Sequence, residues 1–180
     1  MMTRLTWICS GATEANRQAR FPLDESLEEK ATVEARTLAP GLRRADRVFA
    51  SPALRARQTA EALGLDPVVT PELSDCDYGR WAGRSIAEIE ANELAAWMSD
   101  PQATPHGGES IATLCARVEA WMDGQLTLGG HVLAISHAPV LRAAILVTLR
   151  APSASFWRVD AEPLSTLQMT SNGTRWSLRI

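Results

Sequence analysis

The stretch Val48-Phe-Ala-Ser-Pro-Ala-Leu-Arg-Ala-Arg-Gln-Thr-Ala-Glu-Ala-Leu63 contains the signals of a strand, a turn and a helix in direct succession. Val48–Ala50 is a short apolar run that predicts a buried strand. Ser51 and Pro52 then begin a helix that continues to Leu63, because proline costs least at an early helical position, where its missing N–H would have no partner. The stretch therefore predicts a strand followed directly by a helix, the unit from which α/β proteins are built.

The same order of strand and helix occurs on the N-terminal side of this stretch. Leu5–Ser10 is an apolar, β-favouring run that ends at Gly11, as a buried parallel strand does where it meets a loop. Ser26 and Glu29 have the spacing of a capping box, which predicts a helix that continues until Pro40.

The C-terminal side adds several elements. Ser85 and Glu88 repeat the capping-box spacing and predict a helix through Trp97. The other predicted elements are a strand near Val68 and Val69, a polar loop at Pro71–Arg84, a helix after Gly107–Ser110, a buried strand at Val132–Ser136, a helix at Val140–Leu149, and a hairpin of Leu164–Ser171 and Arg175–Ile180 around Asn172 and Gly173.

Strands that alternate with helices predict a mostly parallel central sheet with helices on both faces, a three-layer α/β/α sandwich. The C-terminal hairpin adds an antiparallel edge. The 180 residues contain no internal repeat or linker, so we expect residues 1–180 to form a single domain. In such sheets ligands bind at the carboxyl ends of the strands, which here are Cys9–Gly11 and Ser136–His137.

Composition limits the classes of partner. A net charge of −3 gives no overall field that would attract nucleic acid, so an anion must be held by a local group of arginines. No apolar run approaches the ~20 residues of a membrane span. Leu5–Ile8 is also shorter than the roughly 7 to 15 apolar residues of a signal peptide. Three cysteines without metal-type spacing favour a reducing compartment, so we expect a cytoplasmic protein that binds neither nucleic acid nor membranes.

Several motifs follow one another in an order that resembles the histidine phosphatase superfamily, the phosphoglycerate mutase-like proteins. Ser51–Ala60 matches the family's Ser-Pro-x-x-Arg-Ala-x-Gln-Thr-Ala without a break, which places its phosphate-binding arginine at Arg55. Gly107–Ser110 matches the family's Gly-Gly-Glu-Ser. Ser136–His137 with Arg142 matches its Ser-His-Gly-(x)3-Arg, although Ala138 replaces the glycine. Leu73–Gly83 resembles the loop that carries the general acid, with Asp75 where the family usually has glutamate.

The resemblance implies a phosphoglycerate mutase-like fold and a phosphatase chemistry. In that family the first histidine attacks a phosphate monoester, a carboxylic acid protonates the leaving oxygen, and the phosphohistidine is then hydrolysed. Two arginines and the second histidine hold the phosphoryl oxygens, and neither a metal nor an organic cofactor is needed. The partner implied for this chain is phosphate or a small phosphorylated molecule.

The first motif departs from the family. Where Arg-His-Gly is usual, this chain has Cys9, Ser10 and Gly11, followed by Asn16. Loss of the arginine removes a bidentate cationic donor, worth about 3 kcal/mol of transition-state stabilisation, or about a hundredfold in rate. A serine hydroxyl is a weak nucleophile unless a base takes its proton, so the usual mechanism cannot operate and turnover is expected to be weak or absent.

The resemblance assigns Ser10, Asp75 and His137 to the catalytic positions. It assigns the phosphate-binding positions to Cys9, Gly11, Asn16, Arg55 and His137.

The residues leave alternatives open. His137 could deprotonate Ser10 or Cys9 and give an active phosphatase, or the chain could be a protein-binding scaffold that keeps only the fold. A zinc site of Cys9, Cys76, His137 and Asp75 is chemically suitable but has no support from their spacing. Asp75 could equally be a loop cap, and Cys9 a small filler at a strand end. Substrate identity and oligomeric state stay undetermined by the sequence.

Overall fold

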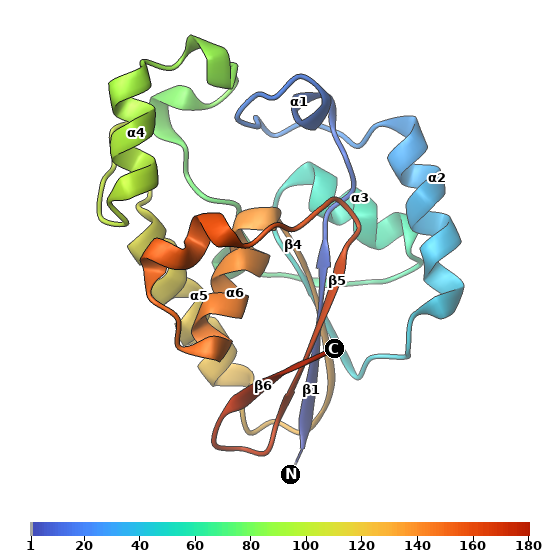
Figure 1. The fold of residues 1–180 in the computed structure, drawn as a ribbon. Helices are drawn as coiled ribbons and strands as arrows, with labels where there is room; N and C mark the ends of the chain where they lie inside the picture. The colour runs from blue at the N-terminus through green and yellow to red at the C-terminus, as the bar shows by residue number, and fades with distance from the viewer. Residues whose placement is uncertain (1) are drawn as a thin grey trace.

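A six-stranded sheet in the order β3-β2-β4-β1-β5-β6 forms the centre of the computed structural model, which describes residues 2–180 (Figure 1). The strands are β1 (Thr3–Cys9), β2 (Arg47–Ala50), β3 (Val68–Val69), β4 (Gly130–Ser136), β5 (Thr166–Ser171) and β6 (Trp176–Arg179). The first four strands are mutually parallel, and β5 and β6 extend the sheet antiparallel beyond β1. The predicted three-layer fold with an antiparallel C-terminal edge is therefore confirmed.

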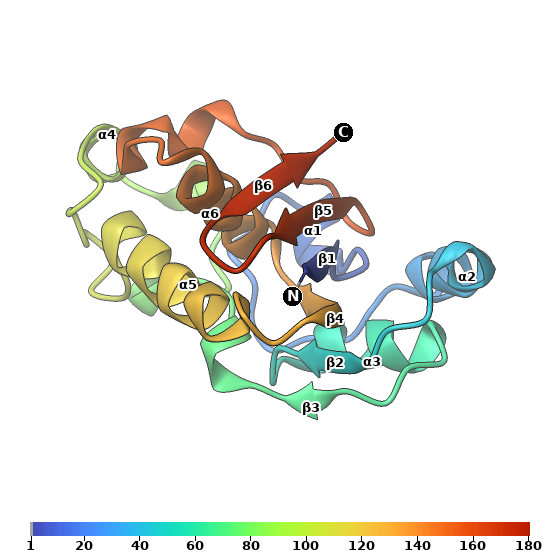
Figure 2. The same ribbon diagram turned by 90° about the horizontal axis from the view of Figure 1, so that it is seen from below.

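Helices cover both faces of the sheet (Figure 2). They are α1 (Glu14–Arg17), α2 (Glu29–Leu38), α3 (Leu54–Ala62), α4 (Ala91–Ser99), α5 (Ile111–Gln125) and α6 (Ala138–Leu149). Leu5 and Trp7 of β1 pack with α5 and α6, whereas Ile8 packs with small residues of α2 and α3. This division follows from the two-residue period of a strand, which turns alternate side chains to opposite faces. Among residues 2–180, no helix is long and apolar enough to cross a membrane.

Three of the predicted helix starts are wrong. The spacing of Ser26 and Glu29 suggested a capping box, but α2 begins at Glu29 with Glu28 as its N-cap and without a capping side chain. The chain before α2 is extended because α3 holds it: the Leu27 amide donates to Oε1 of Gln58 over 2.8 Å. Tertiary hydrogen bonds replace the local cap at this point.

The Ser85–Glu88 capping box is present, but it starts a single 3₁₀ turn at Ile86–Glu88. The following helix, α4, begins separately at Ala91, because Ile89 adopts an extended backbone. The predicted continuous helix from Ser85 to Trp97 is therefore two elements. Pro52 also precedes the helix that it was expected to begin, since the N-cap of α3 is Ala53.

Candidate active site

Three neighbouring parallel strands end at the same edge of the sheet, and each is followed by a polar side chain. Cys9 of β1 pairs with Ser136 of β4, and Ala50 of β2 pairs with Ile135. The next residues, Ser10, His137 and Ser51, therefore lie side by side. Oγ of Ser10 lies 3.5 Å from Nδ1 of His137, and Oγ of Ser51 lies 2.7 Å from Nε2. The sheet register thus brings Ser10 and His137 together as the sequence predicts.

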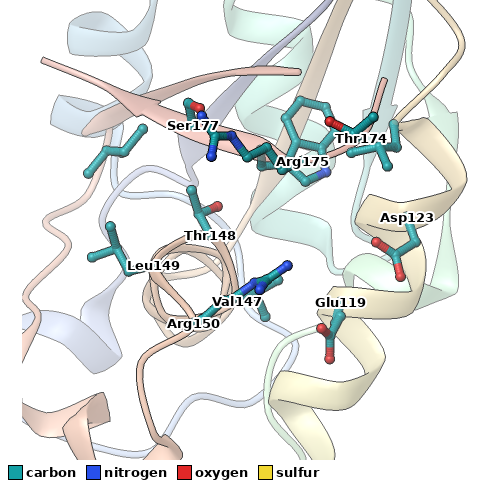
Figure 3. A pocket seen from close by; sticks show the side chains of 12 residues that line it. Glu119, Asp123, Val147, Thr148, Leu149, Arg150, Thr174, Arg175 and Ser177 are labelled. Carbon is teal, nitrogen blue, oxygen red and sulfur yellow. The ribbon is translucent and has the colours of Figure 1, made fainter. Parts of the chain in front are cut away.

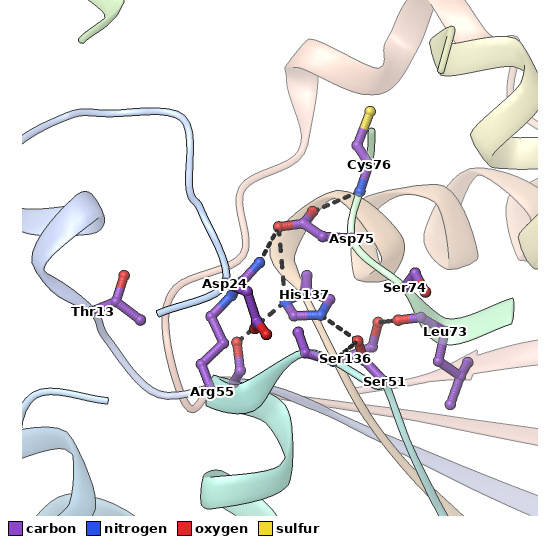
Figure 4. A network of polar contacts seen from close by, with 12 residues as sticks. Thr13, Asp24, Ser51, Arg55, Leu73, Ser74, Asp75, Cys76, Ser136 and His137 are labelled. Atoms are coloured by element: carbon purple, nitrogen blue, oxygen red, sulfur yellow. Dashed lines mark hydrogen bonds and ion pairs between the residues drawn. The ribbon is translucent and has the colours of Figure 1, made fainter. Parts of the chain in front are cut away.

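Arg55 lies in the first turn of α3, directly after this edge, and its side chain is buried. Nη2 donates to Oδ2 of Asp75 over 2.7 Å, and Nη1 donates to the Leu23 carbonyl over 3.1 Å. The same Oδ2 lies 3.8 Å from Nδ1 of His137. Figure 4 shows the Asp75 carboxylate between the Arg55 guanidinium and the His137 ring.

The loop that carries Asp75 is fixed by α5. Arg117 of α5 donates from Nη1 to the carbonyl oxygens of Glu72 and Ser74, and it forms a bidentate ion pair with Glu109. Oδ1 of Asp75 accepts the amide of Cys76 over 2.7 Å. The Gly-Gly-Glu-Ser match therefore has a structural role here, since its glutamate orients the arginine that anchors the acid loop.

His137 is neutral at pH 7 in this environment. Burial lowers the pKa of the imidazole to about 4; the Asp75 carboxylate opposes this shift, whereas the Arg55 guanidinium adds to it. A carboxylate can only accept, so Asp75 favours a proton on Nδ1, and Nε2 is then free to accept the Ser51 hydroxyl. The oxygen of Ser51 already accepts the Ala53 amide over 3.2 Å, which is consistent with its proton pointing to Nε2.

Cys9 packs with the apolar residues on the α5–α6 face of the sheet. Burial, assisted by the nearby Asp75 carboxylate, raises the pKa of its thiol to about 12, so Cys9 is a neutral thiol at physiological pH. It therefore supplies no positive charge where the family has arginine. This environment agrees with the interpretation of Cys9 as a small residue that fills the end of the strand.

Cys76 points away from the Asp75–His137 contact (Figure 4). Its thiol donates to the Glu109 carbonyl over 3.7 Å, and burial raises its pKa. Among residues 2–180, no group of three or more histidine, cysteine or carboxylate residues could hold a metal ion. The zinc alternative therefore has no geometric support in the described part of the chain.

Gly11 and Asn16 make local structural contacts. The Gly11 amide donates to Oγ1 of Thr59 over 3.0 Å, and a side chain at Gly11 would crowd Leu27. Oδ1 of Asn16 accepts the Thr13 amide over 2.9 Å, which caps α1, and Asn16 itself is exposed. Within residues 2–180, neither Gly11 nor Asn16 forms a hydrogen bond with the side chain of Arg55 or His137. Their assignment to phosphate binding stays a prediction.

The site opens into a cleft of about 440 Å³. Arg55, Asp75 and Ser51 line it, together with Pro22, Leu23, Asp24, Pro52, Ala53, Ser74, Cys76, Tyr78 and Ala82, whereas Ser10 and His137 lie behind this lining. Oδ1 of Asp24 accepts the Leu54 amide over 2.7 Å and so occupies the N-terminus of α3. Our sequence interpretation missed Asp24, Ser51 and Arg117, although Ser51 opens the most specific motif and directly follows a strand.

A second cleft, of about 490 Å³, lies between α5, α6 and the C-terminal hairpin (Figure 3). Glu119 and Asp123 line it together with Arg150 and Arg175. None of the residues of the Ser10–Arg55–His137 site lines this cleft, so the two are separate.

Known proteins share both the sequence pattern and the fold. A bifunctional protein of Mycobacterium tuberculosis is 30% identical over 95% of this chain. The chain spans only 51% of that relative, so it covers about half the length of the curated relatives that match at 30% identity. A 2,3-bisphosphoglycerate-dependent phosphoglycerate mutase of Methylobacterium radiotolerans is 32% identical over 79% of this chain and 77% of its own length.

Among solved structures, a mycobacterial glucosyl-3-phosphoglycerate phosphatase in complex with VO3 matches with a TM-score of 0.87 and 27% identity, over 98% of this chain and 97% of that one. A mutant of phosphoserine phosphatase from Entamoeba histolytica, in complex with phosphoserine, has a TM-score of 0.90 at 18% identity, over 99% of this chain and 95% of that one, which shows a shared fold. The model of the histidine phosphatase superfamily (branch 1) matches residues 5–180, and the chain belongs to this family.

Proposed function

We propose that this protein binds a phosphate monoester at Arg55, in the cleft that Ser51 and Asp75 also line and that adjoins His137 and Ser10, and that it turns the ligand over weakly or not at all. The observation that carries the proposal is the contact after β1. The hydroxyl of Ser10 lies 3.5 Å from Nδ1 of His137 there, while the buried Arg55 lines the adjoining cleft. The position that supplies the nucleophile in the family is thus neutral and weakly nucleophilic.

The protonation of His137 supports weak turnover. With its proton on Nδ1, the imidazole can donate to Ser10 but cannot accept the proton that Ser10 must lose in order to attack. Nε2, which could accept a proton, faces Ser51. Cys9, with a thiol pKa of about 12, is no better as a nucleophile.

Binding requires Asp75 to move. Its carboxylate occupies the Arg55 donor that a phosphoryl oxygen would use, so a ligand must displace it. A phosphate dianion carries more charge than a carboxylate and can accept two parallel hydrogen bonds from one guanidinium, which favours the exchange. Asp75 lies on a loop outside the helices and strands, so displacement needs no change in the sheet.

The test is calorimetric titration of the full chain with inorganic phosphate and with phosphoserine, together with Arg55→Gln. Arg57→Gln is the matched control, because Arg57 lies two residues further along α3 with an exposed side chain. We expect Arg55→Gln to weaken binding at least tenfold and Arg57→Gln to leave it nearly unchanged. Equal affinities in the two variants would contradict the proposed site.

Turnover is measured separately with a panel of phosphomonoesters. We expect rates close to the uncatalysed background. Rapid hydrolysis that disappears in His137→Ala would refute the proposal of weak turnover and leave the binding site standing.

One observation favours a second candidate, an active phosphatase with Ser10 as nucleophile: the Ser10 hydroxyl lies 3.5 Å from Nδ1 of His137. If His137 adopts the other tautomer during the reaction, a phosphoserine intermediate forms and can be trapped at low pH. Intact-mass and peptide mass spectrometry after rapid quenching decides this point. A phosphorylated Ser10 supports the second candidate, and the absence of both adduct and turnover contradicts it.

A further inference from the structure

A strip of polar side chains crosses three strands at the end of the sheet remote from Ser10. Arg4 of β1 pairs with Thr170 of β5, and Gln168 of β5 pairs with Arg179 of β6. Residues directly across from each other share a face, and so do residues two apart on one strand. Arg4, Thr170, Gln168 and Arg179 therefore lie on one face of the sheet.

This part of the face lacks a helical cover. On the same face, Ile8 of β1 and Leu133 of β4 pack against α2 and α3. Figure 2 shows these two helices on the β2–β4 side, and within residues 2–180 no helix lies over β5 and β6 on this face at this end. The strip is therefore open to solvent, with Gln168 and Arg179 exposed.

A cleft of about 500 Å³ lies over the strip. Its lining consists of Met2, Arg4, Arg43, Gln168, Thr170 and Arg179. Arg43 comes from the connection between α2 and β2, so three separate segments each contribute a guanidinium. No carboxylate lines this cleft, in contrast to the cleft of Figure 3, where Glu119 and Asp123 balance two arginines.

The three guanidinium groups are unpaired in the described part of the chain. In residues 2–180, Arg4, Arg43 and Arg179 form no ion pair or side-chain hydrogen bond. Asp46 lines an adjoining hollow together with Arg4, but its Oδ2 accepts the His131 amide over 2.7 Å and forms no ion pair with Arg4. Three like charges thus converge in a chain whose net charge is −3.

Solubility alone does not account for this arrangement. A charged residue on an edge strand, such as Arg179, discourages aggregation through the sheet edge. Arg4, however, lies on β1, which is paired on both sides, and Arg43 lies on a loop. Guanidinium groups bind phosphate and carboxylate oxygens with paired hydrogen bonds, and Gln168 and Thr170 add neutral donors between them.

We infer that this cleft is a second anion-binding site, which takes a small polyanion with two or more neighbouring phosphate groups. Its volume suits a compact ligand. Arg4 precedes Ser10 by six strand steps of roughly 3.3 Å, so the site lies about 20 Å from the Ser10 hydroxyl. The inference is therefore independent of the proposed function at Ser10.

The experiment is calorimetric titration of the full chain with sodium tripolyphosphate at 50 mM and 150 mM salt. We expect a saturable site, still present in Arg55→Gln, that binds tripolyphosphate at least tenfold more tightly than orthophosphate. Arg4→Gln and Arg179→Gln should each weaken binding about tenfold or more. Arg175→Gln is the matched control, because it removes an exposed arginine from the same hairpin without touching this cleft, and it should leave the affinity nearly unchanged.

Arg55→Gln separates the two sites. It should leave the tighter tripolyphosphate site intact, so loss of that site in Arg55→Gln would place the ligand at Arg55 and overturn the inference. The inference also fails if no saturable binding occurs, or if Arg175→Gln weakens binding as much as Arg4→Gln. Circular dichroism melting curves check that each arginine variant is folded, and Arg43→Gln provides a third variant outside the sheet.

Discussion

Cys9 and Ser10 are neighbours in the chain but lie in different environments. Cys9 packs into the apolar core beside α5 and α6, whereas the Ser10 hydroxyl faces His137. Neither side chain is charged. The cation that lines the adjoining cleft is Arg55, and Asp75 already pairs with it. These two positions account for the proposed loss of turnover, since they remove the nucleophile and one phosphate-binding cation together.

Restoring both family residues tests this explanation. We expect the double variant Cys9→Arg, Ser10→His to hydrolyse p-nitrophenyl phosphate at least a hundredfold faster than the unmodified chain. Ser10→His alone should fall about a hundredfold below the double variant, because it lacks the second guanidinium. The measurement is steady-state release of p-nitrophenol by each purified variant.

His137→Ala in the double variant is the control, and it should abolish the gained activity. A folded double variant without activity would contradict the explanation. It would indicate that the Asp75–Arg55 ion pair keeps phosphate out even when the nucleophile is present.

Part of the site follows from sequence and part does not. Arg55 and His137 were predicted because each lies in a motif of fixed spacing beside a strand end. The contact of Asp75 with Arg55 was not, because the acid loop contains no regular period and its position depends on Arg117, 42 residues away. Burial determines the protonation of His137, and burial is a property of the whole fold.

At the scale of elements, two loops cross next to the site with almost no space between their backbones. A Cβ atom at Gly108 would overlap the carbonyl oxygen of Asp77, and one at Gly79 would overlap that of His106. The crossing is held by hydrogen bonds from the Glu109 amide to Asp77 and from the Arg80 amide to His106, at 2.8 and 2.9 Å. The two glycines therefore allow the acid loop to dock on the segment before α5.

Gly108→Ala tests the importance of this close approach. We expect it to lower the free energy of unfolding by about 2 kcal/mol, because the overlap forces the loops apart. Gly124→Ala is the matched control: Gly124 lies in α5 with open space around its Cα, so alanine should raise stability by up to about 1 kcal/mol through its better helix propensity. Urea unfolding followed by tryptophan fluorescence measures both, and equal effects of the two substitutions would contradict the argument.

The order of elements was easier to predict than their boundaries. Strong signals such as Asn172–Gly173 and the apolar run of β4 place the hairpin and the buried strand correctly. Ser26 misled the prediction because its neighbour Leu27 bonds to Gln58 of α3, a contact that local sequence does not encode. Local sequence signals thus predict an element correctly where its hydrogen bonds are formed by residues close in sequence. They fail where a distant segment supplies the hydrogen-bond partner.

At the scale of the whole molecule, the buried and neutral His137 couples the stability of the fold to pH. In the unfolded chain the imidazole takes up a proton near pH 6.5, whereas in the folded chain it does so only near pH 4. The unfolded state therefore binds more protons between these values, so the contribution of His137 to stability is fully present above pH 6.5 and is lost as the pH falls towards 4. Between pH 6.5 and pH 4, this difference in the pKa of His137 lowers the free energy of unfolding by about 3 kcal/mol.

Urea unfolding of the full chain and of His137→Gln at pH 7.5, 6, 5 and 4 measures this coupling. Glutamine keeps a polar group towards Ser51 but cannot titrate. We expect the stability of the unmodified chain, relative to the variant, to fall by about 3 kcal/mol between pH 7.5 and pH 4. Comparing the two proteins cancels the pH-dependent contributions of the other titrating groups. These include His106, because burial also lowers the pKa of its imidazole. Parallel stability curves for the two proteins would show that His137 is already charged or exposed in the folded chain.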